Sequence, residues 1–507
     1  MITALIVLLL VLMLGWSGWR ARSYGKLGVY SWFQSGTLLL PWLLFFVLGS
    51  AGVYLNLAGM LILFVSSTAA YVIIGQKVRS IAPEELAKRA EALIKARDDV
   101  NAADTANKSV DAADITAGLP TTKPVKPVAA EDSREVVPSP AEDLTLIRGI
   151  FGIDTFYATE AIPFQDGAVF NGNLRGKLEP SFEKLTGLLH DRVGDRYRLF
   201  LIENQEGRPT IVVLPSSNDP KPMTTSQKIL AVLLAIGTIA TCFETAGILQ
   251  GFDFYTSPQR LNEVVPIGLG LVAVLTVHEL GHWLMADRYE VKLSLPFFFP
   301  TWQIGCFGAL TRFESILKNR NVLFDVALAG PAAGGLLSFA MLLIGLLLSN
   351  PTSQFKVPTE FFEGSVLVGT LARVVLGNAV QETVVAVNPL VILGWLGLVI
   401  TAINLMPAGQ LDGGRLVQAV YGRKIASRAS LATLILLAIV SLVNSLALYW
   451  AIVILFLQRN LERPSLNELT EPDDTRAALG LLALFLMVMV LLPLTPSLAG
   501  RLGFPTL

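Results

Sequence analysis

The sequence predicts an α-helical membrane protein that crosses the bilayer about eight to ten times and carries one small α+β domain outside it. Three observations support this fold class. Of the 507 residues, 53% are hydrophobic and only 16% are charged, whereas a soluble globular chain carries about 25% charged residues. The apolar residues form long uncharged blocks of the length that spans a bilayer. One long polar stretch, residues 77–228, interrupts these blocks.

The apolar blocks are assigned to spans in chain order. Ile2–Trp19 is expected to be a retained membrane anchor, because basic residues follow it rather than precede it. Thr37–Gly75 contains no charged residue and is long enough for two spans. With ten spans and the amino terminus outside, the basic loops all fall on the cytoplasmic side. The further predicted spans are Ile229–Gln250, Val264–Ala286, Val326–Ser349, Val387–Met406, Ala429–Val443, Leu446–Leu457 and Ala477–Leu494.

The polar stretch is expected to contain a linker followed by a folded domain. Pro83–Arg97 has the composition of a surface helix, and Asn101–Pro140 lacks the apolar residues that a core needs, so it is expected to be a flexible linker. The folded part is predicted from a possible strand at Leu144–Ile153, a helix at Pro180–Leu189, and strands at Tyr197–Ile202 and Thr210–Leu214 joined by a hairpin turn. His190, at the end of that helix, is interpreted as a partly exposed structural residue.

These assignments divide the chain into five parts. They are N-terminal transmembrane helices (1–76), a charged helix and flexible linker (77–140), a soluble α+β domain (141–225), a transmembrane core (226–428) and C-terminal transmembrane helices (429–507). Within the core, Val291–Asn321 is apolar but broken by Pro and Gly, which favours a re-entrant hairpin over a straight span. If that hairpin is strand-like, its edge could pair with an extended substrate segment.

Composition also excludes some functions. The net charge of −1 gives no electrostatic basis for binding nucleic acid. The two cysteines, Cys242 and Cys306, are too few for a disulfide scaffold or a multi-cysteine zinc site.

The strongest chemical signal is the run HELGH at residues 278–282, which has the pattern H-E-x-x-H. On a helix, residues four apart share a face, so His278 and His282 can bind one zinc ion. Glu279 is then positioned to act as a general base toward water. The run ends the apolar segment Val264–Val277, where burying ionisable groups is costly unless they have partners.

A catalytic zinc site needs a third protein ligand. The best placed residue is Asp412, in the run NLMPAGQLDGGR at residues 404–415, which follows another apolar block. Irregular backbone at membrane depth is tolerated where it is buried in protein, so Asp412 could face the histidines. It could equally be a turn aspartate at the membrane surface. Asp325, Glu244 and Cys306 are rival ligands.

Together, the two runs resemble the motifs of the site-2 protease family of intramembrane zinc metalloproteases (M50-type), which are HExxH and N-x-x-P-x-x-x-L-D-G. The resemblance covers about residues 264–428. It implies that His278, His282 and Asp412 bind Zn²⁺, that Glu279 is the general acid/base, and that Asn404 lies near the scissile backbone of the substrate. The matched fixed positions are His278, Glu279, His282, Asn404, Pro407, Leu411, Asp412 and Gly413.

A second run narrows the resemblance. GNLR at residues 172–175 is similar to an element of the plant chloroplast proteases named for ethylene-dependent gravitropism deficiency and yellow-green leaves, and of their cyanobacterial relatives. No Ser- and Arg-rich transit peptide precedes the first span. The expected location is therefore a bacterial membrane, specifically the plasma or thylakoid membrane of a cyanobacterium. The alternative is a plastid membrane, with the chain in a processed form.

The resemblance implies hydrolysis of peptide bonds within the bilayer. The expected partners are membrane-protein substrates with a single span, and the lipid bilayer itself. Two alternatives stay open. A membrane transporter or metal-handling protein could also carry intramembrane His, Glu and Asp residues, and a catalytically dead scaffold could bind membrane partners without cutting them.

Overall fold

The computed structural model describes residues 141–504 except 165, 166, 205, 302, 354, 443 and 456–459, together with isolated residues between 15 and 77. The chain forms two compact units, 1–131 and 132–507. In the first unit, residues 28–34 are helical. The predicted spans Ile2–Trp19 and Thr37–Gly75, the helix Pro83–Arg97 and the linker Asn101–Pro140 lie almost wholly outside the described residues.

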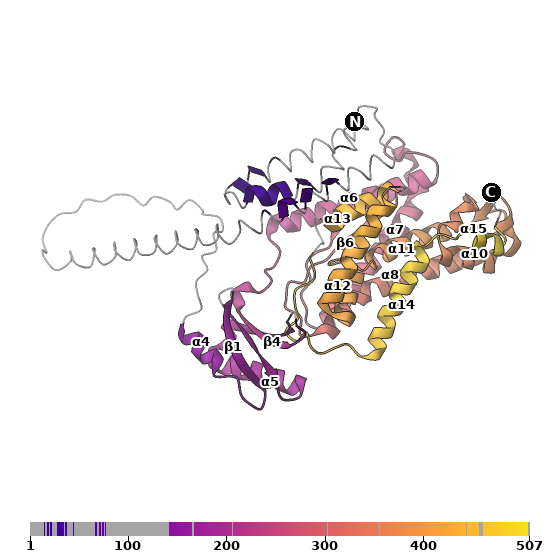
Figure 1. Cartoon of the computed structure of the whole chain (residues 1–507). Coiled ribbons are helices and arrows are strands. Elements are labelled where there is room, and N and C mark those ends of the chain that lie inside the picture. The colour runs from indigo at the N-terminus through magenta and orange to yellow at the C-terminus, as the bar shows by residue number, and fades with distance from the viewer. Residues whose placement is uncertain are drawn as a thin grey trace, which may run out of the picture. The chain divides into compact units, whose positions relative to one another are not determined.

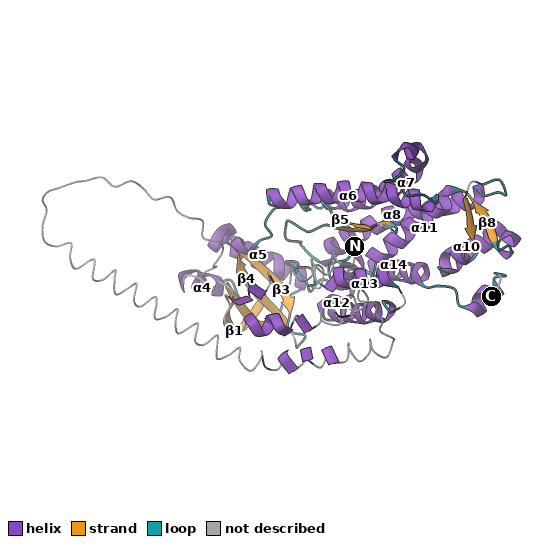
Figure 2. Ribbon diagram, turned by 90° about the horizontal axis from the view of Figure 1, so that it is seen from above, coloured by secondary structure: helices purple, strands orange, loops and turns teal. Residues whose placement is uncertain are grey.

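The soluble domain is an antiparallel sheet in the order β1-β2-β4-β3, with two helices on one face (Figure 2). Alternation along β3 explains the packing, because Leu199 and Leu201 are buried under the helices while Phe200 and Ile202 line a cavity of about 300 Å³ on the other face. The elements are α4 (Ala141–Arg148), β1 (Phe156–Phe164), β2 (Gly167–Leu174), α5 (Leu178–Val193), β3 (Tyr197–Glu203) and β4 (Pro209–Pro215).

The sequence predicted three of these elements and misread the first. The predicted helix corresponds to α5, and the predicted hairpin corresponds to β3 and β4, which pair antiparallel. The strand predicted at Leu144–Ile153 is wrong, because this segment contains helix α4 and a turn. Ile147 and Ile150 are both buried in the domain core, and a spacing of three residues fits one face of a helix rather than the alternation of a strand.

The first three residues of the GNLR run are the last three of strand β2. Gly172 and Asn173 pair with Ala158 and Tyr157 of β1. A Cβ atom on Gly172 would lie 2.2 Å from the carbonyl oxygen of Tyr157. Glycine is therefore needed for the close approach of the two strands.

Four helices among the described residues are long and apolar enough to cross a membrane. They are Thr225–Leu249, Pro258–Arg288, Arg320–Leu348 and Asp474–Leu491. All four overlap predicted spans. The first three contain α6 (Thr225–Leu249), α7 (Leu261–Arg288) and α8 (Arg320–Leu348), and the fourth is α14 (Asp474–Leu491).

The other predicted spans in this unit are shorter or differently bounded. The span expected at Val387–Met406 is the 16-residue helix α11 (Pro389–Asn404), which Asn388 caps by accepting the N–H of Leu390. The spans expected at Ala429–Val443 and Leu446–Leu457 correspond to the second half of α12 (Asp412–Val440), which bends at Gly422, and to α13 (Ser445–Val453). The remaining elements are β7 (Phe355–Pro358), α9 (Glu360–Glu363), α10 (Val366–Leu376), β8 (Val384–Val387) and α15 (Pro496–Arg501).

The segment predicted to form a hairpin does so, and it is built of strands. β5 (Phe297–Thr301) pairs antiparallel with β6 (Gly305–Leu310). Both strands pack against α6, and β6 also packs against α11. Its depth in a bilayer stays a prediction. Helices α7, α8 and α11 run side by side in the bundle next to this hairpin (Figure 1).

Candidate metal centre

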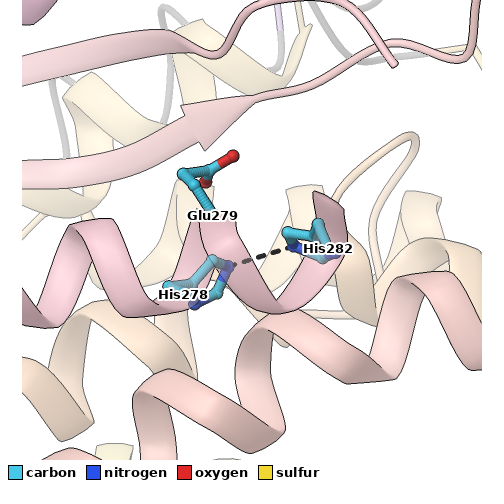
Figure 3. Close-up of side chains that lie close together, drawn as sticks. All are labelled: His278, Glu279 and His282. Carbon is cyan, nitrogen blue, oxygen red and sulfur yellow. Dashed lines mark hydrogen bonds between the residues drawn. The ribbon is translucent and has the colours of Figure 1, made fainter. Parts of the chain in front are cut away.

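Two histidines face inward from the middle of the bundle. His278 and His282 lie one turn apart on α7, and their side chains are 9% and 5% exposed. Their Nε2 atoms are 3.2 Å apart. Figure 3 shows His278 and His282 with their rings close together, while Glu279 leaves the helix toward a neighbouring strand.

Asp412 meets the two histidines from a different helix. It is the first residue of α12, and its Oδ2 atom lies 3.2 Å from Nε2 of His278 and 3.3 Å from Nε2 of His282. Close backbone packing brings the start of α12 here, because a Cβ atom on Gly413 would lie 1.8 Å from the carbonyl oxygen of Leu405. Residues separated by 134 positions thus present three polar atoms to one point.

The three atoms fit a tetrahedral metal ion. Donors at about 2.0–2.1 Å from a tetrahedral zinc ion lie about 3.3 Å apart, which is the separation seen here. Two imidazole nitrogens and a carboxylate oxygen are also donor types that zinc accepts. The site therefore has the geometry and the chemistry to hold such an ion.

A backbone carbonyl of α8 fixes the ring of His282. Nδ1 of His282 donates to the carbonyl of Val326 at 2.8 Å. Since a carbonyl only accepts, Nδ1 carries a proton, and in the neutral imidazole the lone pair that can bind a metal ion is then on Nε2, which faces Asp412.

Glycines on α8 allow this close contact with α7. A Cβ atom on Gly330 would lie 2.2 Å from Nε2 of His282, and one on Gly334 would lie 3.0 Å from Cβ of His278. These two glycines therefore make room for the histidines.

Glu279 is oriented by the hairpin. The hydroxyl of Thr311, just after β6, donates to Oε2 of Glu279 at 2.8 Å. Side-chain ligand atoms of His278, Glu279 and His282 all lie within 4.8 Å of one another. The carboxylate is thus held beside the point where the histidines converge.

Asn404 contacts the hairpin from the other side. Its Nδ2 atom donates to the carbonyl of Phe307 at 3.0 Å and to that of Ile400 at 2.8 Å. A Cβ atom on Gly308, whose φ is +122°, would lie 2.2 Å from Nδ2 of Asn404. Asn404 thereby ties β6 to α11.

The rival ligands and His190 all lie elsewhere. Asp325 accepts two hydrogen bonds from Arg476, at 2.8 and 2.7 Å. Glu244 accepts the N–H of Phe254 at 3.1 Å, and Cys306 contacts the backbone of Gly308. His190 lies beside Asp195 and is mostly exposed.

The sequence did not identify Thr311 and Arg415 as residues that surround the proposed metal ligands and base. Thr311 and Arg415 are both buried, and Arg415 donates from Nη2 to the carbonyl of Thr311 at 2.6 Å. The position of Arg415, directly after the DGG run that begins α12, was a usable signal, because a cation there needs a partner.

The fold and the site define a polytopic membrane protein with a buried set of two histidines and an aspartate. Residues 267–444 match peptidase family M50. Residues 145–221 match the EGY3 middle domain.

Curated relatives extend over most of the chain. The probable zinc metalloprotease EGY2, chloroplastic, of Arabidopsis thaliana is 39% identical over 389 residues, which are 74% of this chain and 68% of that protein. The protein of the same name in Oryza sativa subsp. indica is 38% identical over 404 residues, covering 78% of this chain and 73% of its own length. The probable zinc metallopeptidase EGY3, chloroplastic, of Arabidopsis thaliana is 31% identical over 376 residues, covering 70% and 66%. No solved structure is similar enough to count as a match.

The chain therefore belongs to peptidase family M50, among the relatives of the chloroplast EGY metalloproteases. The relationship predicted from HExxH, the NxxPxxxLDG run and GNLR is confirmed. As a member of this family the chain is a metalloprotease, with protein substrates and a membrane setting.

Proposed function

We propose that this chain is a zinc metalloprotease that hydrolyses peptide bonds within the membrane spans of other proteins. The observation that supports this most directly is the convergence of His278, His282 and Asp412 at separations of 3.2–3.3 Å inside an apolar bundle. In this proposal these three residues hold the zinc ion. Bound zinc would supply a Lewis acid that activates water and polarises the scissile carbonyl.

Glu279 is proposed as the general acid/base. Its carboxylate takes a proton from the attacking water and returns it to the leaving amine. The hydrogen bond from Thr311 fixes Oε2 and so limits the orientations that the carboxylate can take.

The substrate must present an extended backbone to this site. A helical span hides its peptide bonds, so it has to unwind locally before hydrolysis. Strand pairing with the β5–β6 hairpin would stabilise the extended segment, and Thr311 at the end of that hairpin contacts Glu279. Asn404, which holds β6, is proposed to position this strand near the scissile bond.

The proposed substrates are single-span membrane proteins, such as anchored regulators that are released by the cut. With the predicted orientation, water enters the site from the cytoplasmic side. The relatives named above are chloroplastic, which favours a plastid membrane. The plasma or thylakoid membrane of a cyanobacterium is the alternative that the sequence raised.

The transporter alternative is disfavoured, because the relatives that cover most of this chain are named as metalloproteases. An inactive scaffold would bind zinc but would not cleave the substrate, so activity measurements distinguish it from a protease.

The test compares wild type, Glu279→Gln and Glu263→Gln in detergent. Glu263 is the matched control, because it lies on the same helix but pairs with Arg260 at the exposed end.

The measurements are zinc content and cleavage of a synthetic single-span substrate. We expect about one zinc ion per chain in all three proteins, and cleavage that falls by at least about 100-fold only in Glu279→Gln. Zinc without cleavage in wild type would favour a scaffold. Wild-type protein that stays metal-free after zinc loading would overturn the proposed site.

A further inference from the structure

We propose that Glu462 is a positioning residue for this site, acting through Arg415 on both Asp412 and Thr311. The proposal rests on the function proposed above, but it concerns a residue outside the HExxH and LDG motifs. Glu462 belongs to the segment 460–471 between α13 and α14, here called the strap.

Arg415 links the two halves of the site. It lies in the first turn of α12, and its side chain is 4% exposed. Nη1 lies 3.9 Å from Oδ1 of Asp412, the carboxylate oxygen that does not face the histidines in the closest contacts. Nη2 donates to the carbonyl of Thr311 at 2.6 Å, and the hydroxyl of Thr311 donates to Glu279. One guanidinium therefore lies beside the proposed ligand Asp412 and hydrogen-bonds to Thr311, the residue that orients the proposed base.

Glu462 determines where this guanidinium points. Its Oε2 atom accepts from Nε of Arg415 at 3.0 Å and lies 2.9 Å from Nη2. Both side chains are buried, so the ion pair is weakly screened and its geometry is restrictive. Without Glu462, Arg415 would be free to form a closer pair with Asp412 and draw that carboxylate away from the histidines.

Charge balance leads to the same expectation. Glu462 neutralises Arg415 a few ångströms from the proposed cation site. Removing the carboxylate charge would leave a buried positive charge beside Asp412, and this charge would oppose the binding of a divalent cation.

The strap holds Glu462 in place from several directions. The backbone N–H of Glu462 donates to Oε1 of Gln418 at 3.0 Å, and its carbonyl accepts from Nη1 of Arg423 at 2.6 Å. Further along, Leu466 and Glu468 pair with Leu201 at the edge of β3. The strap is thus fixed to α12 on one side and to the soluble domain on the other.

The test uses the full chain in detergent with Glu462→Gln, which removes the charge, and Glu462→Asp, which keeps it. Asp143→Asn is the matched control. Asp143 is a carboxylate of similar burial that accepts two hydrogen bonds from Arg196, at 2.8 and 3.0 Å, within the soluble domain. Zinc affinity is measured by chelator competition, kcat and KM with the single-span substrate, and folding by thermal unfolding.

We expect Glu462→Gln to weaken zinc binding or lower kcat by about 10- to 100-fold with KM unchanged, as for other groups that orient metal ligands. Glu462→Asp should recover most of this loss, and Asp143→Asn should keep both values. Zinc affinity and kcat that both stay within about threefold of wild type in Glu462→Gln would overturn the proposal. Losses that merely parallel those of Asp143→Asn would also overturn it, because they would indicate a purely structural role.

Two further comparisons keep the test decisive. If Glu462→Gln yields no folded protein, Glu462→Ala takes its place, because it also removes the carboxylate charge but buries no amide; zinc affinity and kcat that both stay within about threefold of wild type would reject the proposal. Failure of the underlying function is distinguishable, because wild type itself would then bind no zinc or cleave no substrate.

Discussion

Replacing Gly330 with alanine tests the geometry of the site without replacing any proposed ligand. The new Cβ atom would lie 2.2 Å from Nε2 and 2.4 Å from Cδ2 of His282, whereas ordinary contact begins at 3.4 Å. The ring must therefore move by roughly 1 Å, while zinc–ligand distances tolerate only about ±0.2 Å. A misplacement of about 1 Å costs on the order of 100-fold in rate, so we expect loss of bound zinc and at least that loss of cleavage.

Gly335→Ala is the matched control for this prediction. It adds the same methyl group to the same helix, but the nearest atom is Cγ2 of Thr401 at 3.4 Å. Both substitutions gain about 1 kcal/mol of helix propensity, so a difference between them reports the clash. Zinc content by atomic absorption and cleavage of the single-span substrate are the measurements. A Gly330→Ala protein with wild-type zinc content and activity would refute the reasoning.

Three other predictions follow from neighbouring contacts. Asp412→Asn should weaken zinc binding by more than about 100-fold in chelator competition, and unchanged affinity would remove Asp412 from the ligand set. Asn404→Ala removes the donor to the carbonyl of Phe307. This variant should keep its zinc but cleave about 10-fold more slowly. Cleavage at the wild-type rate would argue against a positioning role for Asn404. Asp325→Asn breaks the partly buried pair with Arg476 and should cost about 1–3 kcal/mol in thermal unfolding with zinc retained, whereas zinc loss would place Asp325 nearer the site than the structure does.

Much of the fold was predictable because apolar blocks of bilayer length have few alternatives. The spans α6, α7, α8 and α14 were found from hydropathy alone. The spacing of His278 and His282 also predicted that they share a face, because i and i+4 positions coincide on a helix. Asp412 was different, since nothing local distinguishes a buried ligand from a turn aspartate beside two glycines. Its place after an apolar block made it the best candidate, but only the resemblance favoured the ligand role over the turn role.

The errors arose where tertiary contacts decide the outcome. The segment Leu144–Ile153 contains enough apolar residues for a strand, but the burial of Ile147 and Ile150 against the domain core selects a helix and a turn. Strand β1 was missed because its sequence, FYATEAIPF, contains a glutamate and a proline that weaken the strand pattern. The contact of Asn404 with β6 depends on the close approach of Gly308, which no sequence spacing encodes.

The cost of burying a charged side chain explains why the site includes a residue as distant in sequence as Glu462. Arg415 follows the LDG motif inside a packed bundle, and a buried cation there needs a partner. No other carboxylate lies as close to it as Glu462 in the described part of the chain. Glu462 lies beyond residue 444, where the match to peptidase family M50 ends. The strap is therefore needed to complete the electrostatics of a centre whose proposed ligands all lie within the matched residues. Because the same strap pairs with Leu201 at the sheet edge, one short segment of chain contacts both the soluble domain and the arginine beside the metal centre.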